Sequence, residues 1–167
     1  PIQGYELDGE GQAFETAFLA LTTEEDPAKF VAILKLWASK RAMLTDEEKS
    51  TLVDSTLAHM EHLNADLLSS CVWSLGVIGY SIDWPSNTKD YSGHMKLSKN
   101  TISFMLSQID RIISSPPTAE ILCRVIGGLS KMGYQWSALP VSLKGVVKDL
   151  LASYSEKPSQ KDENGVR

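Results

Sequence analysis

Apolar residues recur at intervals of three and four along most of the chain, which is the spacing of one face of an α-helix. This pattern predicts helices over residues 10–21, 27–42, 45–60, 64–80, 98–113, 118–133 and 137–154. No segment alternates apolar and polar residues convincingly over the length of a strand. We therefore expect an all-α fold.

Several expected helix starts carry capping signals. Asp26 precedes Pro27, a pair that combines an N-cap carboxylate with a proline at the first helical position, where its missing N–H costs nothing. Thr45 and Glu48 have the spacing of a capping box, in which each side chain binds the backbone N–H of the other residue. Asn64 and Ser98 are expected to cap two further helices.

Two of the expected helices are copies of each other, at residues 65–80 and 119–134. Six apolar positions coincide at an offset of 54 residues, namely 67, 68, 71, 72, 75 and 78 against 121, 122, 125, 126, 129 and 132. Both copies end in Gly-Tyr, and we expect the glycine to adopt the left-handed conformation that closes a helix. A duplicated amphipathic helix predicts a repeat protein, in which each unit buries its apolar face against the next.

The expected architecture is a short α-solenoid of about three helix–turn–helix hairpins, preceded by one N-terminal helix. The hairpins would cover residues 27–60, 64–113 and 118–154, with a long turn-rich loop at 83–96 in the second one. The corresponding division of the chain is an extended acidic arm at 1–11, a helical-repeat domain at 12–154 and a polar C-terminal tail at 155–167.

The segment from Leu67 to Tyr80, which contains Cys-Val-Trp-Ser-Leu-Gly-Val-Ile-Gly-Tyr, resembles the octotricopeptide repeat. That family has a motif of the form Leu-Trp-Ala-Leu-Ala-Lys-Leu-Gly-Tyr, and related repeats occur beside the RAP domain in organellar RNA-processing proteins. The resemblance implies sequence-selective binding of single-stranded RNA in a chloroplast or mitochondrion. The repeat residues it picks out are Trp73, Gly79, Tyr80, Gly133 and Tyr134.

The second copy departs from the first at the signature tryptophan, because Gly127 stands where the first copy has Trp73. Gly128 follows, and two glycines in a helix interior cost about 1 kcal/mol each relative to alanine. The sequence leaves two explanations open: either a neighbouring helix packs unusually close at this point, or the helix is locally distorted.

Charge is unevenly distributed along a chain whose net charge is −5. Residues 1–26 contain seven acidic residues and no base, whereas residues 84–148 carry eight bases and three acids. A local basic surface is therefore compatible with the acidic total. Arg124 and Lys131 lie seven residues apart, hence on one helix face. The other candidates for an RNA-binding path are the bases Lys40, Arg41, Lys96 and Lys99 and the aromatic residues Trp84 and Tyr91. The alternative interpretation is that these residues form solvated helix faces and packed rings.

The sequence offers no nucleophile motif, phosphate loop or dinucleotide fingerprint, so we expect no enzymatic activity, small-molecule substrate or cofactor. His59 and His62 have a spacing that two metal ligands can share, but no third ligand is indicated, and we expect no metal site. Cys71 and Cys123 fit packed thiols in a reducing intracellular compartment rather than a disulfide scaffold. No apolar run approaches the roughly 20 residues needed to span a bilayer.

Two functional hypotheses follow. In the first, the helical-repeat module binds single-stranded RNA. In the second, it is an architectural protein–protein scaffold, a subunit of a large organellar assembly such as a ribosome or a photosynthetic complex.

Overall fold

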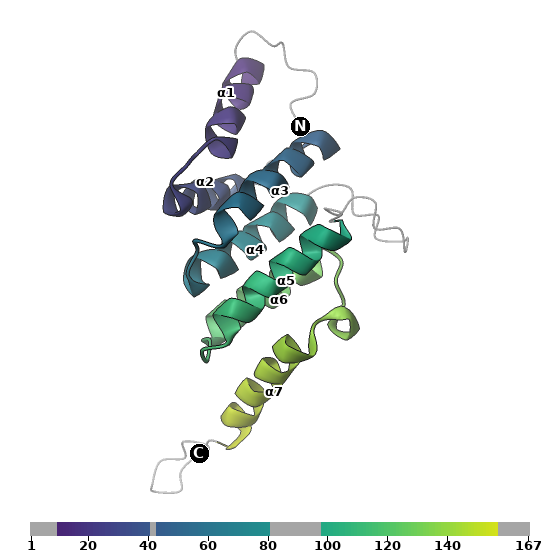
Figure 1. The fold of residues 1–167 in the computed structure, drawn as a ribbon. Helices are drawn as coiled ribbons and strands as arrows, with labels where there is room; N and C mark the ends of the chain where they lie inside the picture. The colour runs from purple at the N-terminus through teal and green to yellow at the C-terminus, as the bar shows by residue number, and fades with distance from the viewer. Residues whose placement is uncertain (1–9, 41–42, 81–97, 157–167) are drawn as a thin grey trace, which may run out of the picture.

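The computed structural model describes residues 10–40, 43–80 and 98–156, and within these ranges the chain is helical with no strand (Figure 1). The all-α prediction is therefore confirmed for this part of the chain. The elements are α1 Glu10–Thr22, α2 Pro27–Ser39, α3 Asp46–Met60, α4 Ala65–Tyr80, α5 Lys99–Ile113, α6 Ala119–Lys131, the 3-10 turn η1 Trp136–Ala138 and α7 Val141–Glu156.

The predicted N-caps are confirmed. Asp26 accepts a hydrogen bond from the backbone N–H of Ala28, and Pro27 opens α2. The capping box of α3 is complete, since the Glu48 N–H donates to the Thr45 hydroxyl at 3.1 Å and the Thr45 N–H donates to Glu48 Oε1 at 2.8 Å. Asn64 caps α4 by accepting a hydrogen bond from the Leu67 N–H, and Ser98 caps α5 by accepting one from the Thr101 N–H. Local sequence signals thus fix these helix starts.

Two predicted boundaries are wrong. The last helix begins at Val141 rather than near Ser137, because Pro140 disfavours the helical conformation at Leu139, which is extended with φ −75° and ψ 149°. The residues before it form the short turn η1 instead. The second helix ends at Ser39 rather than near residue 42, and Lys40 is its C-cap.

The two Gly-Tyr endings behave differently. Gly133 has a positive φ of 98°, and the N–H groups of Gly133 and Tyr134 bind the carbonyls of Ser130 and Leu129, which is the Schellman arrangement. Gly79, in contrast, lies inside α4, which continues through Tyr80. The expected left-handed conformation at Gly79 is therefore wrong, although α4 extends to residue 80 as expected.

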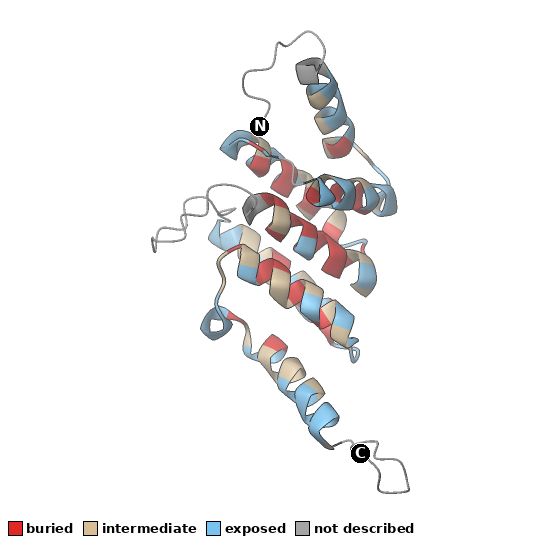
Figure 2. Ribbon diagram, turned by 180° about the vertical axis from the view of Figure 1, so that it is seen from behind, coloured by how far each residue is buried: buried red, intermediate tan, exposed pale blue. Residues whose placement is uncertain are grey.

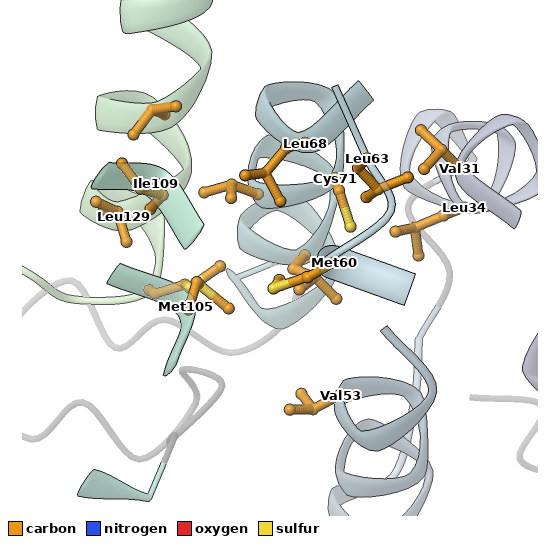
Figure 3. Close-up of a cluster of buried hydrophobic side chains, with 14 of the residues drawn as sticks. Val31, Leu34, Val53, Met60, Leu63, Leu68, Cys71, Met105, Ile109 and Leu129 are labelled. Carbon is orange, nitrogen blue, oxygen red and sulfur yellow. The ribbon is translucent and has the colours of Figure 1, made fainter. Parts of the chain in front are cut away.

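The helices contact one another in two rows that run down the molecule (Figure 1). In one row α4 packs between α2 and α6, and in the other α3 contacts α1 and α5, while α5 also contacts α7. The interior lies between the rows, as Figure 3 shows for side chains from α2 to α6. The labelled residues there are Val31, Leu34, Val53, Met60, Leu63, Leu68, Cys71, Met105, Ile109 and Leu129.

Polar side chains join α3 to the ends of its neighbours in the same row, α1 and α5. The Arg111 guanidinium on α5 donates to the backbone carbonyls of Met60 and Leu63 at 2.9 and 3.0 Å, at the C-terminal end of α3. The His59 ring lies 2.8 Å from the Glu24 carbonyl, and the Ser55 hydroxyl donates to the Thr22 carbonyl. These bonds add side-chain donors to carbonyls at or just beyond the C-terminal ends of α1 and α3.

Candidate functional site

The closest helix contact in the described region joins the two repeat copies, α4 and α6. A Cβ added at Gly76 would lie 2.5 Å from the Gly128 carbonyl oxygen, and one added at Gly128 would lie 2.5 Å from the Val72 carbonyl oxygen. The two backbones therefore touch at glycines. Of the two explanations left open for the glycine pair, close packing of a neighbouring helix is the one that the structure supports.

Equivalent repeat positions meet at this contact. The Trp73 indole covers Gly127, where an added Cβ would lie 2.7 Å from Trp73 Cζ3. Contacts on the two helices advance in the same direction, from Asp66 with Arg124 to Trp73 with Gly127, so α4 and α6 run parallel. The glycine that replaces the signature tryptophan in the second copy thus makes room for the tryptophan of the first.

Arg124 is held between two carboxylates. Its Nη1 lies 2.6 Å from Asp66 Oδ1 on α4, and its Nη2 pairs with the carboxylate of Glu120 one turn earlier on α6. The hydrogen bond to Asp66 is the main reason that the pKa of the Arg124 guanidinium is raised, and partial desolvation opposes it. The positive charge of Arg124 is therefore largely committed to the α4–α6 contact.

Lys131 lies on the same edge of α6, with its Nζ 5.2 Å from the centroid of the Trp73 ring. A cation over an indole face at this distance is a cation–π contact. Arg124 and Lys131 do share a helix face, as their spacing indicates, but that face turns toward α4. Together with Trp73, which is 39% exposed, they form a surface that we call the Trp73 edge.

The other candidates lie apart from this edge or outside the described residues. Lys40 is the exposed C-cap of α2, and Lys99 is an exposed residue in the first turn of α5. Tyr134 packs against the core, and its burial raises the pKa of the phenol. Four candidates lie outside the described residues, namely Arg41, Trp84, Tyr91 and Lys96. The predicted loop at 83–96 lies outside them as well.

Of the groups considered for metal or thiol chemistry, His59 and Cys71 have structural roles in the described region. His59 binds a backbone carbonyl and its ring lies 4.5 Å from that of Phe30. No cluster of three or more His, Cys, Asp or Glu residues able to hold a metal occurs in residues 10–40, 43–80 and 98–156. Cys71 is a packed thiol as expected, and burial raises its pKa to about 12. The expectation that Cys123 is packed is wrong, because its side chain is exposed.

Sequence reasoning missed an exposed apolar surface at the C-terminal end. Of the eight large apolar side chains that are exposed in the described residues, four belong to η1 and α7: Trp136 at 45%, Val141 at 83%, Leu151 at 60% and Tyr154 at 57%. Figure 2 shows that the C-terminal half of α7 is mostly exposed, unlike the middle helices. The periodicity of α7 identifies an apolar face but carries no information on what covers it.

Comparison with known proteins gives no relative, since no family model, curated protein or solved structure matches the chain. Among the helices of the described residues, none combines the length and apolar character needed to cross a bilayer.

Proposed function

We propose that this chain is a non-catalytic helical-repeat scaffold, a short α-solenoid that binds other protein subunits. The order of helix contacts supports the solenoid, because each row continues from one hairpin to the next and equivalent positions of the two repeat copies lie side by side.

The observation that carries the scaffold function is the apolar surface of η1 and α7. Adjacent exposed apolar side chains mark a protein-binding surface, and Leu151 and Tyr154 are three residues apart on one face of α7. The cations that would bind RNA on α6 are meanwhile engaged within the chain, Arg124 by Asp66 and Glu120 and Lys131 by Trp73. Charge therefore favours a protein partner over a polyanion.

The experiment is affinity purification of the tagged full chain from its native cells, with size analysis of what co-purifies. The variant Leu151→Glu plus Tyr154→Glu should lose a stable large complex. The charge-matched control Ala152→Glu plus Ser153→Glu, at exposed positions of the same helix, should keep it. Retention of the complex by the first variant, or absence of any complex with the unaltered chain, would contradict the proposal.

A second candidate, binding of single-stranded RNA in an organelle, is favoured by one observation. Trp73 is a partly exposed indole beside a lysine, and aromatic rings next to cations stack on nucleobases. The chloroplast or mitochondrial location implied by the octotricopeptide resemblance belongs to this candidate and to the scaffold alike.

RNA binding is tested by measuring affinity for single-stranded RNA as a function of salt. An RNA-binding chain should lose affinity steeply as salt rises, and Lys40→Glu plus Lys99→Glu should weaken it further. These exposed lysines are the appropriate targets, because Arg124→Glu would also break the α4–α6 ion pairs. Failure to bind at low salt would exclude this candidate.

A further inference from the structure

The face of α4 that receives α6 combines small residues with the Trp73 indole, which covers Gly127. Ser69, Val72 and Gly76 contact α6 through Arg124 or Gly128, and Ala65 lies on the same helix face at the same spacing of three and four. Ser69, Val72 and Gly76 are buried. This face accepts a parallel helix at backbone distance.

The second repeat copy carries the small residues of this face, with Gly127 at the position of Trp73, and nothing in the described residues covers them fully. The positions of α6 equivalent to 65, 69, 72 and 76 are Ala119, Cys123, Ile126 and Ser130, which we call the outer α6 face. Cys123 and Ser130 are exposed, and Ala119 and Ile126 are only partly buried. The buried residues of α6, such as Val125 and Leu129, turn elsewhere.

Charge follows the same correspondence. Asp66 on α4 binds Arg124 of the arriving helix, and Glu120 occupies the position of Asp66 in the second copy. The Glu120 side chain is 73% exposed, so it can pair with a further cation while it contacts Arg124. The α4–α6 contact within the chain therefore shows which kind of helix this arrangement of residues accepts.

We propose that the outer α6 face binds an α-helix of a partner protein that runs parallel to α6, with a glycine or alanine at the crossing and a basic residue one turn earlier facing Glu120. This inference rests on the scaffold function and names the chemistry of its partner. Two differences from α4 weaken the contact. Ser130 has a side chain where α4 has Gly76, so the arriving helix sits less close than α6 sits on α4. Gly127 supplies no indole to cover the arriving helix as Trp73 covers α6.

The probe is the helix known to fit the equivalent face, a peptide of residues 117–134 held helical by a lactam bridge, with Cys123→Ser in the peptide. Cys123 of the full chain lies in the centre of the proposed site and reports on its occupancy through alkylation by iodoacetamide. Cys71 is fully buried and provides no competing signal. At a peptide concentration about ten times the Kd, alkylation of Cys123 should slow about tenfold.

Variants of the chain and of the peptide make the test specific. Ser130→Gly in the chain should tighten binding, Ser130→Arg should abolish protection, and Ser103→Arg on the exposed side of α5 should leave it unchanged. A peptide with Gly128→Leu should not protect, because its side chain would meet the backbone of α6.

Each contrary outcome is informative. Unchanged alkylation at millimolar peptide, protection by the Gly128→Leu peptide, or protection of the Ser130→Arg chain would overturn the inference. Protection that appears without peptide as the chain is concentrated would assign the face to a second copy and would also overturn it. The scaffold function is tested by a different experiment, the loss of the complex in the Leu151→Glu plus Tyr154→Glu variant. The outcomes above therefore leave that test unaffected.

Discussion

Gly128 on α6 and Gly145 on α7 are both glycines in helix interiors, and their surroundings are opposite. An added Cβ at Gly128 would enter the backbone of α4, whereas an added Cβ at Gly145 would have no atom within 4 Å. The same contrast holds for apolar residues, since Val72 and Leu129 at the α4–α6 contact are fully buried and Val141 and Leu151 on α7 are exposed. Similar helix patterns thus produce a tightly packed centre and an open end.

The largest expected effect separates the two glycines directly. Gly128→Ala should destabilise the fold by about 1–3 kcal/mol, because the methyl group must push α4 and α6 apart. Gly145→Ala should instead stabilise it by about 0.5–1 kcal/mol, since alanine favours the helix and meets open space. Urea unfolding of both variants measures the difference, and equal effects would show that the centre is no tighter than the end.

A second test uses the pH dependence of stability at the packed centre. Burial raises the pKa of Cys71 from 9.0 to about 12, so the unfolded chain loses this proton at lower pH than the folded chain. The contribution of the protonated Cys71 thiol to the free energy of unfolding is complete below pH 9 and declines as pH rises toward 12. Urea midpoints measured from pH 8 to 10.5 should fall more steeply for the unaltered chain than for Cys71→Ala. Parallel curves would mean that the thiol is not buried as described.

A smaller effect is expected at Ser74, which occupies in α4 the position that Gly128 occupies in α6. Its hydroxyl is buried with no hydrogen-bond partner. Ser74→Ala should therefore raise the free energy of unfolding by up to about 1 kcal/mol, because a desolvated hydroxyl is removed without creating a large cavity. A loss of stability on thermal or urea unfolding would indicate that the hydroxyl has a partner in solution.

The smallest effect is expected at the open end. Leu151→Gln should change stability by no more than about 0.5 kcal/mol, since the side chain is largely solvated in the folded chain. Calorimetry of the isolated chain provides the measurement. A large loss would mean that α7 is packed more tightly in solution than its exposure indicates, and the contrast with the α4–α6 contact would disappear.

The helix starts could be predicted from the sequence because their causes are local. Asp26, Thr45, Asn64 and Ser98 each bind a backbone N–H within three residues, so the information lies in a few neighbouring letters. The wrong start predicted for the last helix, near Ser137, has a local cause as well. Pro140 disfavours a helical conformation at Leu139, and this effect can be predicted from the sequence.

Long-range features were predictable only in part. The shared face of Arg124 and Lys131 follows from helical spacing, but their partners Asp66 and Trp73 lie on another helix, which the period of α6 does not specify. Gly79 and Gly133 occupy equivalent positions, yet Gly79 is helical and Gly133 has a positive φ, so the dipeptide alone does not decide the conformation. The exposure of α7 depends on which elements pack against it, and the sequence pattern of α7 does not predict those elements.

The meeting of Trp73 with Gly127 has a consequence for how the two units can diverge. A chain built from two identical first units would set indole against indole at this crossing, and one built from two identical second units would leave a gap there. The two units are therefore sterically complementary at this crossing, and neither can replace the other without a change in packing.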